Sequence, residues 1–306
     1  TLPGSTGGPL NGQGPLKPEI DYAFEYSDCW ADDARLVVLN AVQAASLGAD
    51  IRPYTRCESA SRVGDLWQVD LLVGEHVRER VQARALVNAA GPWAARVMER
   101  VVSTRSPYGV RLVQGSHIVV PELYHGRQAY ILQNEDERIV FVLPYEGGYS
   151  LIGTTDVDYQ GDPARVEPTD GEVEYLLEVV NGHFKRQLKH SDICHRFSGV
   201  RPLISDASEA DPSAVSRDYS LTLHGDASEA PLLAVYGGKL TTYRRLAEAA
   251  VDKLKPWFPT ATPAWTAEYA LAGGDFASHA SLTAELKAEF PWLTDQQLDR
   301  FVRCYG

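Results

Sequence analysis

The sequence predicts a mixed α/β protein with two domains. Apolar strands run into helical patterns at 85–94 and again at 232–254, with small residues at each turn. Between them, residues 111–153 form short alternating runs joined by polar turns, which is typical of an antiparallel sheet. A helical pattern then starts at Asp170. With 306 residues the chain is long enough for two cores.

The composition is that of an ordinary globular protein, with 44% hydrophobic and 23% charged residues. The net charge of −12 predicts no nucleic-acid partner and means that an anionic substrate needs a local basic pocket. No apolar run approaches the roughly 18 residues of a transmembrane helix. The four cysteines lack metal-ligand spacing, so we expect reduced thiols, a cytosolic protein and no metal site.

The first part of the chain predicts a connecting segment followed by the first domain. Residues 1–20 hold five glycines and four prolines and begin without methionine, so we expect residues 1–31 to be a connecting segment, turn-rich at its start, inside a longer protein. Asp32 and Asp33 can cap a helix that ends at Gly48. Short strands, most of them in a small antiparallel sheet, are predicted at 51–55, 57–63, 66–72, 77–81 and 85–88.

Residues 101–195 are expected to form the substrate-binding domain, a sheet with one helix. Its strands are predicted at 111–121, 129–133, 138–144 and 149–153. Strands at 196–203 and 232–236 are expected to return to the first domain, which would comprise 32–100 and 196–256. Two helical patterns, 278–289 and 295–303, would begin a helical region over 257–306.

The turn from Gly237 to Tyr243 is the strongest candidate for a ligand site. Two glycines let a ligand approach the backbone, and the following helix directs free N–H groups with a partial positive charge at it. Lys239 adds a full charge, and Thr241 and Thr242 add hydroxyl groups. This pattern predicts a flat or anionic ligand, although ordinary strand–helix turns carry the same glycines.

Two arginines are candidates for holding an anionic substrate. Arg201 ends a strand in an apolar context, where a buried guanidinium needs an anion and a phosphate matches its fork geometry. An internal salt bridge would satisfy it equally. Arg217 is the second candidate, with the neighbouring Asp218 as an alternative partner.

His117 is the candidate base. It interrupts an apolar strand, and histidine has the pKa range needed to take an alcohol proton near neutral pH. A core histidine with a hydrogen-bond partner is the alternative. Asp156 follows a strand end and could orient His117 or cap the next loop.

Six motifs carry a family resemblance. They occur in the order Phe-Glu-Tyr-Ser-Asp-Cys-Trp (24–30), Asn-Ala-Ala-Gly-Pro-Trp (88–93), Gln-Gly-Ser-His (114–117), Gly-Thr-Thr-Asp (153–156), Ser-Gly-Val-Arg-Pro-Leu (198–203) and Gly-Gly-Lys-Leu-Thr-Thr-Tyr (237–243). Together they resemble the FAD-dependent, membrane-associated glycerol-3-phosphate dehydrogenases over essentially the whole sequence. The resemblance implies a two-domain flavoprotein fold of the amine- and sugar-oxidising type. It also implies oxidation of sn-glycerol 3-phosphate to dihydroxyacetone phosphate, with electrons passed to quinone.

The resemblance assigns roles to particular residues. His117, Asp156 and Lys239 would be catalytic, and Arg201, Arg217 and Lys239 would bind the substrate. FAD would contact Arg56, Cys57, Asn88, Ala89, Ala90, Gly91, Gly238, Lys239, Leu240 and Thr241. Whether Lys239 serves the flavin or the substrate stays open. The resemblance also implies peripheral attachment to the inner face of the cytoplasmic membrane and leaves a homodimer open.

One departure from the family pattern is large. The family opens with a strand, a Gly-x-Gly-x-x-Gly turn and a helix that hold the FAD pyrophosphate, and this sequence has no such unit. The first alternative is therefore an inactive fragment of the substrate domain that acts only as a binding or structural module. A glycerol-3-phosphate oxidase that reduces O2 is the second.

Overall fold

The structure is a computed structural model that describes residues 6–9, 14–205, 218–226 and 228–306. It divides into two compact units. Unit 1 comprises Thr1–Asp28, Asn88–Ser220 and Ala234–Gly237, and unit 2 comprises Cys29–Val87, Leu221–Leu233 and Gly238–Gly306. The domain boundaries expected from the sequence stay a prediction.

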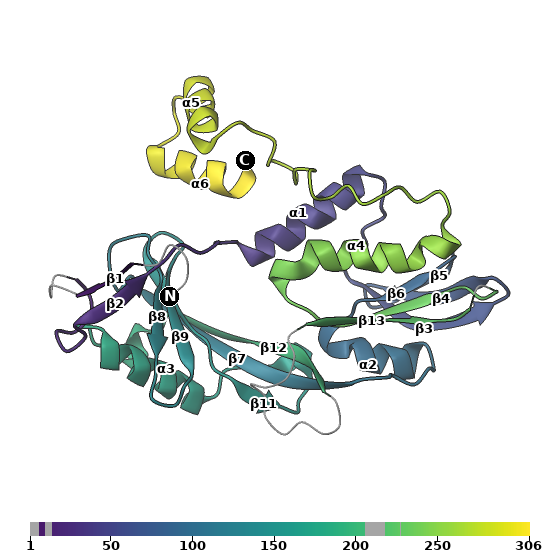
Figure 1. Cartoon of the computed structure of the whole chain (residues 1–306), viewed down its shortest axis with the longest axis horizontal. Helices are drawn as coiled ribbons and strands as arrows, with labels where there is room; N and C mark the ends of the chain where they lie inside the picture. Colours follow the sequence, from purple (N-terminus) through teal and green to yellow (C-terminus); the bar gives the residue numbers. More distant parts are fainter. Residues whose placement is uncertain (1–5, 10–13, 206–217, 227) are drawn as a thin grey trace. The chain divides into compact units, whose positions relative to one another are not determined.

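Unit 1 is built on a six-stranded antiparallel sheet (Figure 1). The strand β7 pairs with β12 along one edge and with β10 and β11 along the other, and β9 and β8 follow β10. The strands are β7 (Gly109–Pro121), β8 (Tyr130–Gln133), β9 (Ile139–Tyr145), β10 (Tyr149–Gly153), β11 (Val157–Tyr159) and β12 (His195–Ser205). The predicted sheet is confirmed, but β12 was expected in the first domain. Its partner is β7, through a long-range pairing that local sequence cannot reveal.

Helix α3 (Asp170–His183) lies against one face of this sheet (Figure 1). Alternate strand residues point to one face, so the even-numbered positions of β7 face the helix. They join a buried core that holds Ile118, Val120, Val140, Val142, Ile152, Val173, Leu176, Leu177, Val180 and Phe184. Each such apolar side chain contributes about 1.5–3 kcal/mol on burial, so this core fixes the sheet firmly.

Shorter elements complete unit 1. The strand–turn–helix predicted at 85–94 is present, and Ala94 and Met98 are fully buried. The expected connection at 1–31 contains a strand pair, which sequence reasoning missed. The bounds are β1 (Thr6–Pro9), β2 (Tyr22–Glu25), η1 (Gly91–Trp93), α2 (Ala94–Arg96), the π-helical turn η2 (Val97–Val101), η3 (Pro163–Arg165) and η4 (His190–Asp192).

Unit 2 begins with helix α1 (Asp33–Ser46). Asp32 caps it by accepting a hydrogen bond from the Arg35 N–H (2.9 Å), and Gly48 follows its end with a φ of 96°. An antiparallel sheet follows, with β3 (Thr55–Val63), β4 (Leu66–Val73) and β5 (Val77–Ala83) in sequence order. The strand predicted at 51–55 is wrong. Pro53 lacks a backbone donor and Tyr54 has a φ of 55°, so the chain turns there before β3 begins.

A three-stranded sheet joins β13 (Tyr219–His224), β14 (Leu232–Gly237) and β6 (Leu86–Asn88) in that order. The apolar run in β14 is buried, as predicted. Within unit 2, the Trp67 indole donates to the Pro231 carbonyl (3.0 Å). The Arg62 guanidinium lies 4.7 Å from the Trp67 ring centre and donates to two carbonyls of the 224–230 segment. These contacts hold His224, Ala230 and Pro231 beside β3 and β4.

The rest of unit 2 is helical. The elements are η5 (Leu240–Thr242), α4 (Tyr243–Leu254), η6 (Lys255–Trp257), α5 (His279–Glu289) and α6 (Asp295–Tyr305). The two predicted C-terminal helices are confirmed and lie against each other, with Leu298 and Val302 buried (Figure 1). In the part of the chain that the structure describes, no helix is both long and apolar enough to cross a membrane.

Candidate functional site

The odd-numbered residues of β7 form the face of the sheet opposite α3, which we call the front face. Gly115 and His117 lie on it, and the strand register places Gly199 beside Gly115 and Phe197 beside His117. Gly153 of β10 lies on the other side of His117. Residues paired across strands point to the same face, so this register brings the Gln114–His117 and Ser198–Leu203 motifs together.

His117 lies flat between two neighbours on the front face. Its imidazole stacks on the Phe197 ring, with centres 5.1 Å apart and planes 9° apart. On the other side, a Cβ added to Gly153 would stand only 2.1 Å from His117 Cδ2. The missing side chain of Gly153 therefore provides the space in which the imidazole lies.

Arg201 reaches toward the same region from β12. Its guanidinium forms an ion pair with Asp156 and donates to Thr154 Oγ1 (3.1 Å). A Cβ added to Gly115 would stand 2.9 Å from Arg201 Nη2, so the guanidinium covers that glycine. The side chain of Arg201 is 34% exposed and that of Asp156 is 42% exposed. The expectation of a buried arginine in an apolar context is wrong, and the internal salt bridge left open by the sequence is present.

The arrangement places a cation and a base next to each other. The guanidinium of Arg201 lies over Gly115, two residues from His117 along an extended strand, which corresponds to about 7 Å. A short phosphorylated alcohol can span this separation. Arg201 can hold a phosphate through its planar fork of donors, and an imidazole at the other end can accept a hydroxyl proton.

Behind the front face lies a buried carboxylate, Glu172, which sequence reasoning missed. Only 6% of it is exposed, and it accepts hydrogen bonds from Ser116 Oγ (2.7 Å), Thr155 Oγ1 (2.6 Å) and Gln114 Nε2 (2.7 Å). Burial raises the pKa of the Glu172 carboxyl, but hydrogen bonds from Thr155, the Thr169 backbone and Ser116 together bring it below its usual value. A threonine three residues before a glutamate is a capping-box signal that the sequence did offer.

The predicted flavin turn has a backbone geometry that favours glycine. Gly237 and Gly238 have φ values of 65° and 97°, and a Cβ on Gly237 would stand 2.6 Å from the Asp218 carbonyl oxygen. The next residues, Lys239, Leu240 and Thr241, are exposed at the start of the helical segment. The Thr242 hydroxyl instead donates to the Lys239 carbonyl (3.0 Å), so it holds the turn. The exposed backbone of residues 238–241 at the start of this helical segment fits a flavin edge.

The two segments predicted to contact the FAD adenosine also fit. Arg56 and Cys57 lie on β3, which is an edge strand of its described sheet and has an irregular register between Cys57 and Ser59. Such an edge leaves backbone groups available to a ligand. Burial, and then the nearby Asp70, raise the pKa of the Cys57 thiol, which disfavours a reactive thiolate.

The second adenosine segment is the turn at 88–91. The Asn88 side chain donates to the Ala94 carbonyl (2.9 Å) and accepts from the Ala90 N–H (3.2 Å), so it supports the turn. Gly91 has a φ of 53°, and the space where its Cβ would stand holds no atom within 4 Å among the described residues. The backbones of Ala89, Ala90 and Gly91 can therefore be approached closely.

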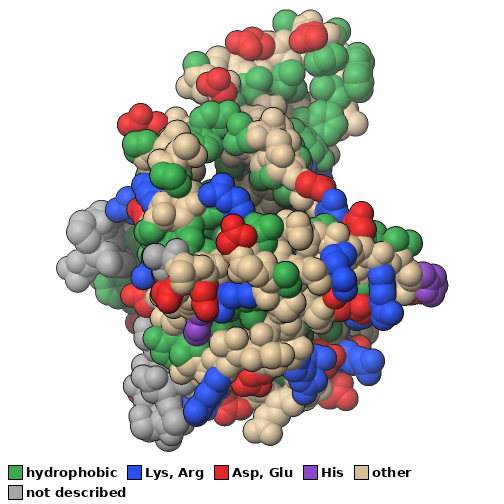
Figure 2. All heavy atoms as spheres, turned by 90° about the vertical axis from the view of Figure 1, so that its right-hand side faces the viewer, with side chains coloured by type: hydrophobic (Ala, Val, Ile, Leu, Met, Phe, Trp, Pro, Cys, Tyr) green, Lys and Arg blue, Asp and Glu red, His purple; other side chains and the backbone are tan. Residues whose placement is uncertain are grey.

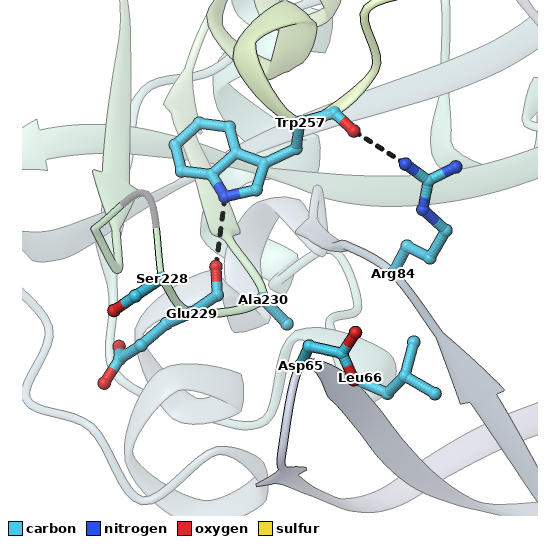
Figure 3. A pocket seen from close by; sticks show the side chains of 7 residues that line it. All are labelled: Asp65, Leu66, Arg84, Ser228, Glu229, Ala230 and Trp257. Carbon is cyan, nitrogen blue, oxygen red and sulfur yellow. Dashed lines mark hydrogen bonds between the residues drawn. The ribbon is translucent and has the colours of Figure 1, made fainter.

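A separate pocket of about 260 Å³ in unit 2 contains none of these residues (Figure 3). Trp257 Nε1 donates to the Glu229 carbonyl (3.0 Å), and Arg84 donates to the Trp257 carbonyl (2.7 Å). Its lining residues include two acidic ones, Asp65 and Glu229, and one basic one, Arg84, so the charge balance does not favour a phosphate. On the face drawn in Figure 2, acidic and basic side chains are interspersed over most of the surface.

The structure brings His117, Asp156 and Arg201 together within unit 1. Lys239 and Arg56 lie in unit 2. Arg217 falls outside the described residues. Among the residues that are described, no group of three or more His, Cys, Asp or Glu side chains is arranged to hold a metal ion. The roles predicted for all these residues stay predictions.

Comparison with known proteins identifies the fold. The family model described as FAD dependent oxidoreductase matches residues 10–244. A glycerol-3-phosphate dehydrogenase of Pseudomonas aeruginosa is 53% identical over the whole chain, and the aerobic glycerol-3-phosphate dehydrogenase of Escherichia coli is 49% identical. The chain spans 60% and 61% of their lengths.

A solved structure agrees. The glycerol-3-phosphate dehydrogenase of Bacillus halodurans, complexed with FAD, aligns with 99% of this chain at a TM-score of 0.77 and 25% identity, and the chain covers 63% of it. The expected family resemblance and the flavoprotein fold are confirmed. With the family model matching more than half of its residues, the chain belongs to the family of FAD-dependent oxidoreductases.

Proposed function

We propose that the protein of which this chain forms part oxidises sn-glycerol 3-phosphate to dihydroxyacetone phosphate. The observation that carries the proposal is that the Arg201 guanidinium lies over Gly115. Gly115 is two residues from His117 on β7 and lies on the same face of the sheet. The names of the two relatives at 53% and 49% identity support this choice of substrate.

Arg201 binds the phosphate in this proposal. Asp156 and Thr154 already fix the guanidinium from one side, which reduces the entropy lost when a ligand binds to it. The partial exposure of the pair leaves the guanidinium accessible to a second anion. Arg217 remains the second proposed phosphate ligand.

His117 accepts the proton of the C2 hydroxyl. Stacking on Phe197 and the space over Gly153 fix the plane of the imidazole, so the ring is oriented before the substrate arrives. FAD, when bound, supplies the acceptor for the hydride that leaves C2.

The exposed start of the segment after Gly237 contacts the flavin edge. Gly238, Leu240 and Thr241 offer backbone donors there, and Lys239 adds positive charge where a reduced flavin gathers negative charge. The backbones at Arg56–Cys57 and at Asn88–Gly91 contact the adenosine part.

The electron acceptor, the location and the assembly belong to the same proposal. Electrons pass to a quinone, and the protein is peripheral on the inner face of the cytoplasmic membrane; a homodimer stays open. Reoxidation of the reduced protein by a soluble quinone analogue and by O2, compared in a stopped-flow instrument, tests the acceptor. Faster reoxidation by O2 would favour an oxidase.

The substrate is tested by steady-state kinetics of the full-length protein. Arg201→Ala should raise KM for glycerol 3-phosphate about thirtyfold, because a charge-assisted hydrogen bond contributes about 2 kcal/mol. Arg196→Ala is the matched control, since Arg196 lies on the same strand but points to the opposite face, where it pairs with Asp170 (3.1 Å). An unchanged KM for Arg201→Ala would remove this residue from the phosphate site.

A further inference from the structure

We propose that Glu172 is a positioning residue that holds the front face in its productive arrangement from behind. It touches neither the substrate nor the flavin in this scheme. Its kinetic effect rests on the proposed function, whereas its contacts stand on the structure alone.

Both oxygens of the Glu172 carboxylate are saturated by donors. Oε1 accepts from Ser116 Oγ (2.7 Å) and Thr155 Oγ1 (2.6 Å). Oε2 accepts from Gln114 Nε2 (2.7 Å), from the Thr169 N–H (3.0 Å) and from Thr169 Oγ1 (2.8 Å). Five hydrogen bonds therefore converge on one carboxylate that is 6% exposed.

A helix cap needs only part of this arrangement. In a capping box the glutamate accepts from the backbone N–H of the N-cap residue, which is Thr169 here, and it can do so at the surface. The bonds from Gln114 and Ser116 of β7 and from Thr155 after β10 come from outside the helix. A buried carboxylate is costly unless it is fully hydrogen-bonded, so this one ties the helix to the sheet and the loop.

Strand alternation carries this anchoring to the front face. Ser116 points to the back, so its two neighbours on β7, Gly115 and His117, point to the front. The Thr155 hydroxyl is bound to Glu172 and also accepts a hydrogen bond from the Ser116 N–H (2.9 Å). The residue after Thr155 is Asp156, the partner of Arg201.

Strand β12 is anchored through Ser198. Its hydroxyl lies 2.6 Å from Ser116 Oγ, and it points to the back between Phe197 and Gly199. The stacking partner of His117 is therefore held by the same network. A shift of Glu172 would move the supports of the base and of the phosphate ligand at once.

Glu172→Gln is the informative substitution, because it keeps the volume of the side chain. The Thr169 N–H can only donate, so the amide oxygen must take the place of Oε2 and the amide nitrogen that of Oε1. Ser116 and Thr155 must then turn their hydroxyl protons away. Glu178→Gln is the matched control, since Glu178 is an exposed carboxylate of the same helix.

The experiment uses the full-length flavoprotein, with rates normalised to bound flavin. Glu172→Gln should lower kcat/KM for glycerol 3-phosphate at least about tenfold, because misplacement of a catalytic group by an ångström can cost a hundredfold. It should also weaken the calorimetric affinity for dihydroxyacetone phosphate, while Glu178→Gln should match the wild type in both measurements. A role confined to stability would lower the melting temperature and leave both quantities unchanged.

A second variant covers the case in which Glu172→Gln does not fold. Ser116→Ala removes one donor and leaves the carboxylate with four, and it should lower kcat/KM in the same direction by about two- to tenfold. Wild-type kinetics per flavin in the folded variant would overturn the positioning role. A wild-type protein that does not oxidise glycerol 3-phosphate would instead refute the proposed function.

Discussion

Gly153→Ala is the sharpest perturbation of the proposed base. The new Cβ would stand 2.1 Å from His117 Cδ2 and 2.7 Å from Cγ and Nε2. An ordinary contact needs at least 3.4 Å, so the imidazole must move by about 1.3 Å. On the other side the ring stacks on Phe197, so it must leave its present plane to make this movement.

The effect of Gly153→Ala on stability should be much smaller than its effect on kcat. A displaced side chain costs about 0.5–1.5 kcal/mol in rotamer strain, and replacing glycine by alanine in a strand returns about 0.5–1 kcal/mol, so the stability should change by less than about 1 kcal/mol. A base displaced by more than an ångström should cost about 100-fold in kcat. We therefore expect a folded, flavin-containing enzyme with a strongly reduced kcat.

The assay is kcat with glycerol 3-phosphate, together with the melting temperature and the flavin content. Gly182→Ala is the control, because it adds a methyl group on the exposed side of α3, where no atom of the described residues lies within 4 Å outside the helix's own backbone. A double-mutant cycle with His117→Asn makes the test specific, since Gly153→Ala should have little further effect once the imidazole is absent. An unchanged kcat for Gly153→Ala, or full additivity in the cycle, would refute the assignment of His117 as the base.

Three further predictions follow from the same geometry. Arg201→Lys should reverse only part of the rise in KM that Arg201→Ala causes, because an ammonium cannot reproduce the planar fork of donors. Steady-state kinetics of the two variants checks this. A KM for Arg201→Lys equal to that of Arg201→Ala or to that of the wild type would contradict it. Because the folded state holds the pKa of Glu172 below its usual value of about 4.3, the stability that this carboxylate contributes is complete above that pH and is lost as the pH falls below it. Urea unfolding from pH 3.5 to 7 should accordingly show a difference between wild type and Glu172→Gln that shrinks only below about pH 4.5, and a difference independent of pH would contradict it. Lys239→Ala should lower the flavin reduction potential, because the charge that favours the reduced form is lost; a spectroscopic titration measures it, and an unchanged potential would remove Lys239 from the flavin edge.

Local patterns predicted the elements well wherever the signal was strong. Alternation gave β7, β9 and β10, and the apolar run before Gly237 gave the buried strand β14. The error at 51–55 arose because Pro53 and Tyr54 turn the chain, and a short apolar run does not reveal such a turn. Local sequence is informative about an element and much less so about its ends.

The pairing of strands far apart in the sequence could not be predicted from local sequence patterns. The placement of β12 beside β7 depends on residues about 80 positions apart, and no local pattern records that choice of partner. The same pairing decides that Arg201 lies over Gly115 and that Phe197 stacks on His117. The sequence could nominate Arg201 and His117 separately, but only the fold brings them together.

The residues that support the candidate base and the candidate phosphate ligand were the hardest to predict from the sequence. Gly153 matters because it has no side chain, and Glu172 resembles any glutamate in the first turn of a helix. Their roles follow from what surrounds them, namely an imidazole at one and four donor residues at the other. Residues of this kind are found by asking which group each buried polar atom contacts.

The most direct test of the account is a crystal structure of the full-length protein with dihydroxyacetone phosphate. We expect the phosphate to accept hydrogen bonds from the Arg201 guanidinium, with the C2 oxygen within hydrogen-bond distance of His117. A phosphate bound elsewhere, with Arg201 contacting only Asp156, would contradict it.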